Sequence, residues 1–570
     1  MGEHTMTMGT GGRATATSKG AGKGGARDGA PASGRSADRL YQRVADALEA
    51  QVRTGVYPEG TRMPSIRRLR EQQRVSTSTV LEALRVLEDR GVVRARPRSG
   101  HYVLAPGRPH GEQLGEPDSS APPGTPSHVD ASLALRLNLG IGNPQEPTLG
   151  AAVQGPELMP ITALNRLMSQ VLRYQPSACH SYDAPPGTPA LRRAVARRGV
   201  DAGYSVRPDE VVVTSGAKEA VYLSIRAVTR PGDAVAIESP AYYALLEVLA
   251  SLGLRALEVA THPRQGIDLD HLAHVLATER VAAVAMAANF SNPTGSCMSD
   301  DAKRRLVALL EAHDVPLVED DVYGDLVFEG PRPRAVKAFD RSGLVLYCAS
   351  YSKTLSPGLR VGWAIPGRYQ QELELLKLVM NQATAPAPQL ATAAFIESGG
   401  FDRHLRRVRG MYREQMERTI DAVTRSFPRE TRLTRPAGGH VLWVQLPEGV
   451  DAMELYEAAG ALGIRIAPGP MFTPRGGYED FIRLNTGFRW QESTERQIDT
   501  LGQLVAARAS RAGQPSSTTT TVWSEGLLPP GLFFRASRSI SADTARDASG
   551  AERSTRSMRI PMPLWKLPAR

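Results

Sequence analysis

Cysteine is scarce in this sequence, and long apolar segments are missing. Three cysteines occur in 570 residues, Cys179, Cys297 and Cys348, and no two of them form a CxxC pair. This spacing argues against a disulfide framework or a cysteine-rich zinc site and fits a reducing compartment. No run of about eighteen or more apolar residues is present, so neither a membrane-spanning helix nor a secretory signal is indicated. We therefore expect a cytoplasmic protein with no membrane partner and no metal site.

A chain of this length exceeds what one hydrophobic core supports, which predicts two or more domains. The formal net charge is +10. A positive excess indicates a polyanionic partner only where it is concentrated in one module. The distribution of charge along the chain is therefore more informative than its total.

Three segments have no apolar periodicity and predict no packed core. Residues 1–36 are mainly glycine, alanine, serine and threonine, and residues 506–570 are rich in serine, threonine and arginine. Such composition is typical of disordered tails. Residues 107–136 are rich in proline, glycine and serine. They indicate a linker that would let the modules on either side move relative to each other.

Residues 37–106 contain three short helical patterns followed by a basic hairpin. The first pattern repeats apolar residues at helical spacing and ends in a Gly-Val-Tyr-Pro turn. The second and third begin after Ser65 and Ser76, which suit the N-cap position. Two strand-like segments then flank a basic tip that contains Arg98. Three helices and a hairpin in this order predict a winged helix-turn-helix, whose third helix can enter the major groove.

Charge is concentrated in this same region. Residues 37–106 carry thirteen arginines and eight acidic residues, an excess of five positive charges. The arginines gather between Arg67 and Arg74 and between Arg94 and Arg98. Alternatively, these arginines could simply form the solvent-exposed face of a helical bundle. The helix-turn-helix order favours DNA, because it puts these arginines where a phosphate backbone would lie.

Residues 40–103 resemble the GntR family of bacterial regulators. Three pieces carry the resemblance: Met-Pro-Ser-Ile-Arg-Arg-Leu at 63–69, Val-Ser-Thr-Ser-Thr-Val with the helix that follows at 75–91, and Arg-Ser-Gly-His-Tyr-Val at 98–103. The resemblance implies binding to double-stranded DNA through Arg67, Ser76, Thr77, Thr79 and Arg98. Many family members have arginine where this chain has Thr77, so the operator sequence stays open.

Residues 137–505 alternate helical patterns with short apolar runs, which predicts an α/β fold. The runs at 210–214, 234–238, 281–286, 316–319 and 344–348 are nearly all apolar. Strands of this kind are covered on both faces and are mostly parallel. Ligands usually bind where such strands end.

Polar residues follow each of these five runs. A lysine at the end of a buried strand, among hydroxyls and ahead of an arginine, suits a covalent bond to an aldehyde cofactor that carries a phosphate. Serine and glycine at the mouth of a helix suit the phosphate itself. Each residue alone also has an ordinary interpretation as a cap, a core aromatic or a surface lysine. In chain order the candidates are Ser215, Gly216, Ala217, Tyr242, Asn292, Asp320, Asp321, Tyr323, Ser350, Ser352, Lys353 and Arg360.

Together these pieces resemble the fold-type I aminotransferases, which use pyridoxal 5'-phosphate and have a smaller C-terminal α+β subdomain. The resemblance implies that Lys353 holds the cofactor as a Schiff base. Asp320, three positions before Tyr323, would pair with the ring nitrogen. Asn292 and Tyr323 would hydrogen-bond the ring hydroxyl, and Tyr242 would stack on the ring. The phosphate would lie among Ser215, Gly216, Ala217, Ser350, Ser352 and Arg360.

Three further positions follow from the same resemblance. Tyr182 matches a tyrosine that reaches the cofactor phosphate of a neighbouring subunit, which implies a homodimer. Arg483 lies where the family binds the substrate α-carboxylate, a task that suits a bidentate donor. Gly142 would border the substrate. His440 lies in a strand-like segment and receives no chemical role.

A GntR-type winged helix joined to an aminotransferase-like module is the layout of the MocR-type regulators. The first hypothesis is therefore a transcription factor that binds pyridoxal phosphate and an amino-compound effector, an amine or amino acid. The second is an active aminotransferase, converting amino acids to 2-oxo acids, with the winged helix as an accessory. The third is a scaffold that binds DNA without cofactor. The residues alone leave the effector, the operator and the direction of regulation open.

Overall fold

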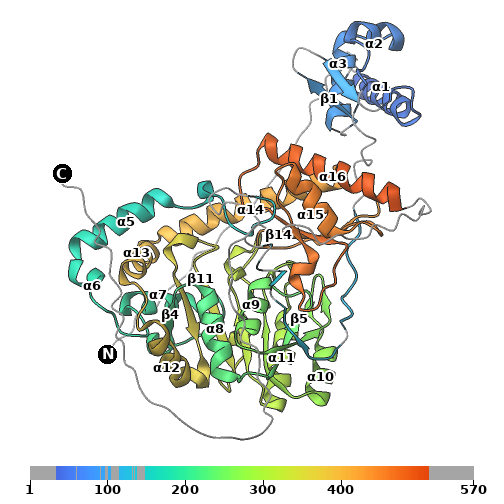
Figure 1. Ribbon diagram of the computed structural model, residues 1–570. Coiled ribbons are helices and arrows are strands. Elements are labelled where there is room, and N and C mark those ends of the chain that lie inside the picture. Colours follow the sequence, from blue (N-terminus) through green and yellow to red (C-terminus); the bar gives the residue numbers. More distant parts are fainter. Residues whose placement is uncertain are drawn as a thin grey trace, which may run out of the picture. The chain divides into compact units, whose positions relative to one another are not determined.

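The computed structural model describes residues 34–58, 61–89, 92–96, 100–103, 114–122, 124–130, 132–133, 135, 137 and 148–512 (Figure 1). Most of the two predicted tails falls outside these ranges. The first helix begins at Gly34, and the last one continues to Ala512, beyond the predicted domain end at 505. None of the described helices combines the length and apolar composition needed to cross a membrane.

The N-terminal module has the predicted order of three helices and a hairpin. Ser65 and Ser76 are N-caps: their Oγ atoms accept hydrogen bonds from the backbone N–H of Arg68 at 3.3 Å and of Thr79 at 3.2 Å. The two strands pair antiparallel, with Val93 opposite Val103. The elements are α1 (Gly34–Arg53), α2 (Ile66–Gln73), α3 (Thr77–Asp89), β1 (Val93–Arg96) and β2 (Gly100–Val103).

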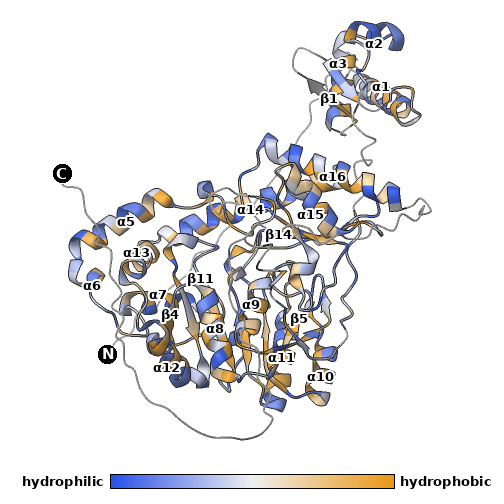
Figure 2. Cartoon of the chain, in the orientation of Figure 1, coloured by the Kyte–Doolittle hydropathy of each residue, from blue (hydrophilic) through white to orange (hydrophobic). Residues whose placement is uncertain are grey.

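A small apolar core holds this module together. Leu69 is the one buried residue of α2, which is mostly hydrophilic in Figure 2. Such an amphipathic helix keeps its exposed side chains, Arg67 among them, available to a partner. The buried core residues are Val44, Ala45, Leu48, Met63, Leu69, Val80, Ala83, Leu84, Leu87, Val92, Val93 and Val103.

The larger module is built on an eight-stranded sheet with the order β3-β6-β5-β9-β10-β11-β12-β4. The strands from β6 to β11 are parallel to their neighbours, whereas β3, β12 and β4 pair antiparallel. This mixed, mostly parallel sheet confirms the predicted fold class. The strands are β3 (Ser127–His128), β4 (Val212–Thr214), β5 (Ala234–Glu238), β6 (Arg255–Val259), β9 (Val281–Met286), β10 (Leu317–Asp320), β11 (Val345–Ser350) and β12 (Gly362–Ile365).

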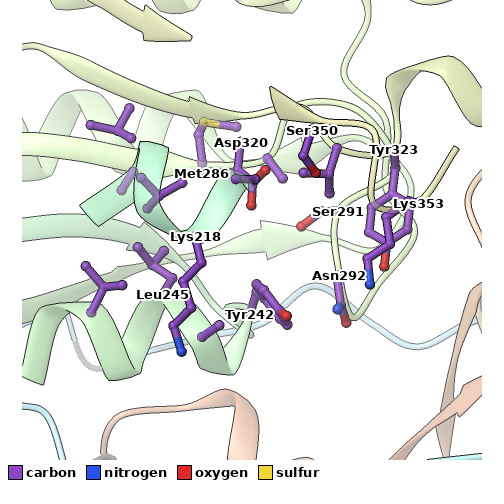
Figure 3. A pocket seen from close by; sticks show the side chains of 18 of the residues that line it. Lys218, Tyr242, Leu245, Met286, Ser291, Asn292, Asp320, Tyr323, Ser350 and Lys353 are labelled. Atoms are coloured by element: carbon purple, nitrogen blue, oxygen red, sulfur yellow. The ribbon is translucent and has the colours of Figure 1, made fainter. Parts of the chain in front are cut away.

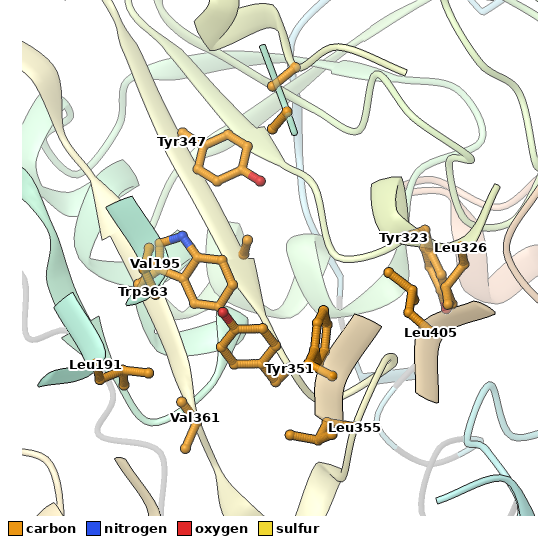
Figure 4. Close-up of a cluster of buried hydrophobic side chains, with 14 of the residues drawn as sticks. Leu191, Val195, Tyr323, Leu326, Tyr347, Tyr351, Leu355, Val361, Trp363 and Leu405 are labelled. Atoms are coloured by element: carbon orange, nitrogen blue, oxygen red, sulfur yellow. The ribbon is translucent and has the colours of Figure 1, made fainter. Parts of the chain in front are cut away.

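Helices cover both faces of this sheet, as its uniformly apolar strands require. In β11, Leu346 and Cys348 pack on one face with α8, α9 and α12, whereas Tyr347 and Ala349 pack on the other with α7, α13 and α14 (Figure 4). The helices are α5 (Ile161–Tyr174), α6 (Pro176–His180), α7 (Pro189–Arg198), α8 (Ala217–Val228), α9 (Tyr243–Ser251), α10 (Leu269–Thr278), α11 (Asp300–His313), α12 (Gln370–Asn381), α13 (Pro386–Glu397) and α14 (Gly400–Ser426).

A smaller α+β subdomain follows α14, as predicted. Its antiparallel sheet has the order β13-β14-β16-β15, and α15 and α16 pack their apolar faces in the same buried cluster as this sheet. We call this part the small subdomain and the eight-stranded sheet with its helices the large subdomain. The small subdomain contains β13 (Arg432–Leu433), β14 (Val441–Gln445), α15 (Ala452–Ala461), β15 (Ala467–Pro468), β16 (Phe481–Asn485) and α16 (Glu492–Ala512).

Part of the predicted linker packs against both subdomains. We call residues 114–122 and 124–128 the strap. Its Gly115 carbonyl accepts a hydrogen bond from the Leu433 N–H at 2.9 Å, and Asp118 pairs with Arg432 at 2.7 Å. These contacts attach the strap to the small subdomain. Within residues 107–136, the strap is thus held by specific contacts rather than free.

The same strap continues onto the large subdomain. Glu116 forms an ion pair with Arg264, and the Thr261 N–H donates to Ser120 Oγ at 2.7 Å. The strap ends in β3, which adds an antiparallel edge strand beside β6. Its lack of apolar periodicity hid this arrangement from the sequence, because charged pairs and hydrogen bonds hold it together with a single buried leucine, Leu114.

Candidate functional site

A cavity of about 260 Å³ lies where the parallel strands of the large subdomain end at their carboxyl edge (Figure 3). The last residues of β5, β9, β10 and β11 form part of its wall: Glu238, Met286, Asp320 and Ser350. Ala217, the first residue of α8, lies in the same wall. Open α/β sheets bind their ligands at this edge, because successive strands deliver side chains to one place.

Lys353 lies in this wall, on the loop that follows β11. Its Nζ donates a hydrogen bond to the Ala152 carbonyl at 2.6 Å. Burial lowers the pKa of Lys353 to about 8; the charges of Arg483 and Arg360 lower this pKa further, and Asp320 opposes them. A lowered pKa gives a lysine a larger fraction of neutral, nucleophilic amine near neutral pH than an ordinary lysine has.

Asp320 and Asp321 face different surroundings, although they are adjacent in the chain. Asp320 lines the cavity, and its buried Oδ1 has no partner among the described residues. Asp321 instead accepts hydrogen bonds from Arg332 Nη2 at 2.6 Å and from the Tyr347 hydroxyl at 3.0 Å. Burial, together with the charge of Asp321, raises the pKa of Asp320 to about 7. Asp320 is therefore the carboxyl group that a ligand in the cavity would meet.

Asn292 lines the cavity and contacts Arg483, which lies behind it and is not itself a lining residue. Arg483 lies on β16 of the small subdomain and is fully buried. Its Nη1 donates to Asn292 Oδ1 at 3.3 Å, its Nη2 donates to the Gly150 carbonyl, and its Nε has no partner among the described residues. The Tyr323 hydroxyl is likewise buried and unpartnered within the described part of the chain. These groups leave hydrogen-bonding capacity for a ligand.

The N-terminus of α8 meets Arg360 across a glycine. Arg360 Nη2 donates to the Ser215 carbonyl at 2.6 Å. Gly216 has φ +86° and lies against the Arg360 guanidinium. This dihedral angle favours glycine, because residues with a Cβ rarely adopt it. Ser350 and Ser352 line the same cavity as Arg360. The Ser352 N–H donates a hydrogen bond to Ser350 Oγ at 3.4 Å.

Tyr242 also lines the cavity, at the N-terminus of α9. Tyr182 is elsewhere: the residue is 82% exposed and does not line the cavity of its own chain. Gly142 lies outside the described residues. The structure thus brings Lys353, Asp320, Asn292, Tyr323, Tyr242 and the α8 end together.

The candidate DNA contacts lie on the winged helix. Arg67, on α2, has a side chain that is 85% exposed and forms an ion pair with Glu71 at 3.3 Å. Ser76 and Thr77 at the start of α3 are exposed, and Thr79 is half-buried. Arg98 of the wing lies outside the described residues.

Sequence reasoning missed three polar side chains of the cavity wall: Lys218, Glu238 and Ser291. Figure 3 shows Lys218 toward the end of the cavity opposite Lys353. Lys218 pairs with Glu247, away from the Lys353 group. Glu238 was visible as the only acidic residue of an apolar strand, and this is the signal that could have identified it.

His440 is a buried neighbour of the site. Its ring stacks on Tyr412 at 5.3 Å and meets the edge of Tyr323 at 5.2 Å. Burial, assisted by the charge of Lys353, lowers the pKa of His440 to about 3. Its Nδ1 lies 3.0 Å from Asn485 Oδ1. His440 is therefore a neutral ring that packs behind Tyr323.

A winged helix and an aminotransferase-type α/β module with a lysine in its ligand cavity define the class of protein. Residues 40–103 match the model of the bacterial regulatory proteins of the gntR family. The chain belongs to the aminotransferase class I and II family, whose model matches residues 137–494.

Two regulators of Escherichia coli (strain K12) are similar over most of their length. The uncharacterized HTH-type transcriptional regulator YdcR is 37% identical over 472 residues, covering 82% of this chain and 100% of the relative. The uncharacterized HTH-type transcriptional regulator YjiR is 33% identical over 479 residues, covering 82% of this chain and 98% of the relative.

Among solved structures, the chain resembles LysN, the alpha-aminoadipate aminotransferase of Thermus thermophilus, complexed with N-(5'-phosphopyridoxyl)-L-leucine. The identity is 30% with a TM-score of 0.62, over 67% of this chain and 97% of that one. The family and this neighbour imply pyridoxal 5'-phosphate as cofactor.

The described residues fit this cofactor. Asp320 Oδ1 and the Tyr323 hydroxyl are buried polar atoms that need a partner, which a ring nitrogen and a ring hydroxyl can provide. Arg360 and the N-terminus of α8 offer a cation and free N–H groups to a phosphate.

Proposed function

We propose that this protein is a transcriptional regulator that binds double-stranded DNA through its winged helix. Its aminotransferase-like module would bind pyridoxal phosphate and an amino compound. One observation carries the proposal: a gntR-type winged helix and a cavity lined by Lys353, Asp320 and Arg360 occur on one chain. A ligand cavity gives a DNA-binding protein a means to sense a small molecule. The similarity to two E. coli regulators over 82% of the chain supports the same conclusion.

On the DNA side, α3 would enter the major groove with Ser76, Thr77 and Thr79 near its N-terminus. The exposed Arg67 would neutralise a phosphate. Arg98 would contact phosphate or the minor groove from the wing. Because hydroxyl side chains hydrogen-bond many bases, these residues support DNA binding without specifying an operator.

On the cofactor side, Lys353 would hold the aldehyde covalently. Asp320 would keep the ring nitrogen protonated, and Asn292 and Tyr323 would donate to the ring hydroxyl. Bound pyridoxal phosphate supplies an electron sink for bonds to the carbon that carries the amine. Tyr242 would cover one ring face. The phosphate would lie among Ser215, Gly216, Ala217, Ser350, Ser352 and Arg360.

The surroundings of Arg483 indicate that the bound amino compound carries a carboxylate. Among the described residues, the hydrogen-bond partners of this buried guanidinium are the Asn292 side chain and the Gly150 carbonyl, and neither is acidic. A buried cation without a counter-ion is costly, and a bidentate carboxylate would satisfy its free Nε. Amino acids therefore fit the site better than simple amines. Gly142 would border the same ligand.

A homodimer would complete the site. Tyr182 is 82% exposed, which leaves its hydroxyl free to reach the cofactor phosphate of a second copy. Leu375, Leu378, Val379 and Met380 of α12 are also exposed apolar residues. Such a group is typical of an interaction surface.

The strap provides a physical route from the cavity to the DNA-binding module. It is attached to the small subdomain at Arg432 and to the large subdomain at Arg264. Arg483 of the small subdomain contacts Asn292 of the large one, so a ligand bound between them would favour one spacing of the subdomains. If that spacing changes, one of the two attachment points of the strap must move relative to the other. The strap lies between the winged helix and the cavity residues in the sequence. The ligand acts only through its different affinity for the two arrangements.

DNase footprinting on the DNA upstream of the protein's own gene tests the proposal. The holoprotein should protect a discrete site, and an amino acid from a panel should change the protected pattern. Protection of no specific sequence, or identical footprints with and without cofactor and every amino acid, would overturn it.

Active transamination is the second candidate, because Lys353 and Asp320 line one cavity and Arg483 contacts Asn292 in its wall. Its assay is the conversion of amino-acid and 2-oxo-acid pairs by wild type and by Lys353→Ala. Measurable turnover that depends on Lys353 would make the protein an enzyme with an accessory DNA-binding domain. Under either function, a DNA partner and three unpaired thiols favour the cytoplasm.

A further inference from the structure

Glu238 is a buried carboxyl group that faces the cofactor cavity. It ends β5, lines the cavity wall and is 4% exposed. Its Oε2 accepts two hydrogen bonds, from the Ala287 N–H at 2.9 Å and from Ser291 Oγ at 3.1 Å. Its Oε1 is buried and has no partner among the described residues. A carboxyl group in such a place is costly unless its hydrogen bonds are useful to the site.

Both donors belong to the turn that follows β9 and carries Asn292. The turn is held at Ser291, whose N–H donates to the Ser296 carbonyl at 3.0 Å. Phe290 within it has φ +55°, a conformation that a bulky residue adopts only when its surroundings hold it there. Glu238, on the neighbouring strand β5, thus holds the turn by hydrogen bonds on both sides of Phe290, at Ala287 and at Ser291.

The Asn292 amide has a defined orientation at the end of this chain of contacts. Its Oδ1 accepts from Arg483 Nη1 at 3.3 Å. The amide nitrogen of Asn292 is therefore the group left to donate into the cavity. Glu238, Ser291, Asn292 and Arg483 form a continuous path from the large sheet to the small subdomain.

We propose that Glu238 is a positioning residue for the cofactor ring, acting through the Ala287–Asn292 turn to hold the Asn292 amide where it meets the ring hydroxyl. Glu238 does this with one oxygen, Oε2, so a glutamine, whose amide oxygen can accept the same two hydrogen bonds, is its conservative replacement. Alanine removes the acceptor and leaves the Ala287 N–H and the Ser291 hydroxyl buried without a partner. The inference rests on cofactor binding, one part of the proposed function.

The charge state of Glu238 makes the glutamine comparison informative. Burial raises the pKa of Glu238 to about 7, the hydrogen bonds from Ala287 and Ser291 lower it, and the charge of Asp320 raises it. Near neutral pH the wild-type side chain therefore carries a fractional charge. If its role is to accept hydrogen bonds, removing the charge with Glu238→Gln should matter little.

Glu258 offers a matched control. It lies on β6, next to β5, is 6% exposed and accepts a hydrogen bond from Ser239 Oγ at 2.8 Å. Glu258 does not line the cofactor cavity. Replacing it removes a buried carboxylate of the same type from the adjacent strand without touching the Asn292 turn.

The experiment measures the dissociation constant of pyridoxal phosphate by fluorescence and the absorbance spectrum of the bound cofactor against pH. Glu238→Ala should weaken cofactor binding about 30-fold, since two hydrogen bonds are lost at roughly three- to tenfold each. Its pH midpoint of absorbance should also shift. Glu238→Gln should stay within about threefold of wild type, and Glu258→Ala should leave both measurements unchanged.

A double-mutant cycle with Asn292→Ala tests whether Glu238 acts on cofactor binding through Asn292. If Glu238 acts through Asn292, Glu238→Ala should have less than half its effect, on a logarithmic scale, in the Asn292→Ala background. Full additivity would overturn the proposal, as would equal losses in Glu238→Ala and Glu258→Ala. Should Glu238→Ala fail to fold, Ser291→Ala replaces it in the cycle, with a loss of about threefold expected.

The same measurements separate this inference from the proposed function. Wild type that binds pyridoxal phosphate but shows no ligand-dependent DNA binding would contradict the regulator and leave the role of Glu238 intact. Wild type that binds no pyridoxal phosphate would overturn both the cofactor and the role of Glu238.

Discussion

The winged helix and the cofactor cavity present their functional side chains in opposite ways. In the winged helix the candidate contacts lie on the outside, with the Arg67 side chain 85% exposed. In the cavity they are enclosed: Arg483 is fully buried, and Asp320 has a buried oxygen without a partner among the described residues. A surface site tolerates substitution and depends on salt. An enclosed site depends on the exact partners of each polar atom, so single substitutions there should have larger effects.

The largest effect should follow from Lys353→Ala. It removes the only amine that we expect to bond to the cofactor, so the absorbance of covalently bound cofactor should disappear. Lys218→Ala is the matched control, because Lys218 lines the same cavity but pairs with Glu247. Absorbance spectra after addition of pyridoxal phosphate distinguish them. Retention of the bound spectrum in Lys353→Ala, or its loss in Lys218→Ala, would assign the bond to another residue.

Arg483→Ala should weaken the binding of amino acids about 100-fold, the cost of losing a bidentate, charge-assisted contact. Arg483→Lys keeps the charge and should restore only part of the affinity, because lysine lacks the planar fork. Spectral titration of the holoprotein measures both. The control ligand is the corresponding amine without the carboxylate. Its affinity should be the same for wild type, Arg483→Ala and Arg483→Lys. An equal loss for amine and amino acid would contradict a carboxylate role.

Arg67→Ala should weaken DNA binding about tenfold and lower the slope of log K against log salt by about 0.9, the signature of one lost phosphate contact. The Arg67–Glu71 pair is exposed, so the free energy of unfolding should barely change. Anisotropy of labelled DNA at several salt concentrations measures the effect. Arg418→Ala, which removes a similar exposed pair with Glu414, is the control. Equal slopes for Arg67→Ala and wild type would exclude Arg67 from the interface.

Ser76→Ala should destabilise the winged helix by about 1 kcal/mol, because Ser76 Oγ caps α3 through the Thr79 N–H. Thr77→Ala, one position later and exposed, should change stability by less than about 0.5 kcal/mol while still weakening DNA binding. Urea unfolding of the full chain, followed by a probe in residues 40–103, measures both. Equal stabilities would show that the cap contributes nothing.

The smallest effect should come from the strap. Arg432→Ala and Arg264→Ala each remove one exposed attachment, to Asp118 and to Glu116. Either variant should reduce the amino-acid-dependent change in DNA affinity by about threefold, consistent with the small energy of exposed ion pairs. Cofactor spectra should be unchanged. An undiminished response in the double variant would exclude the strap as the route between cavity and DNA.

Local chemistry explains what the sequence could predict. The N-caps Ser65 and Ser76 follow from side-chain chemistry at helix starts, and both are present. The five apolar runs all form strands of the large sheet, because burial on both faces leaves a clear pattern. The convergence of Lys353, Asp320 and Asn292 on one cavity follows from their positions at strand ends. Their chemical roles remain predictions.

The features that escaped prediction depend on contacts between distant parts of the chain. Glu238 looked like the end of an apolar strand, and its partners Ala287 and Ser291 belong to another strand's turn. The strap lacks periodicity, since the ion pairs with Arg264 and Arg432 and one buried leucine, Leu114, hold it in place of a repeating apolar face. Neither contact leaves a local pattern in the sequence.

The central claim is that the ligand cavity controls DNA binding. Its most direct test is the dissociation constant of the holoprotein for the DNA upstream of its own gene, measured while an amino acid is titrated, in wild type, Lys218→Ala and Lys353→Ala. We expect the amino acid to change this constant in wild type and Lys218→Ala and to have no effect in Lys353→Ala. The same response in Lys353→Ala as in wild type, or no response in any of the three to any amino acid, would contradict the claim.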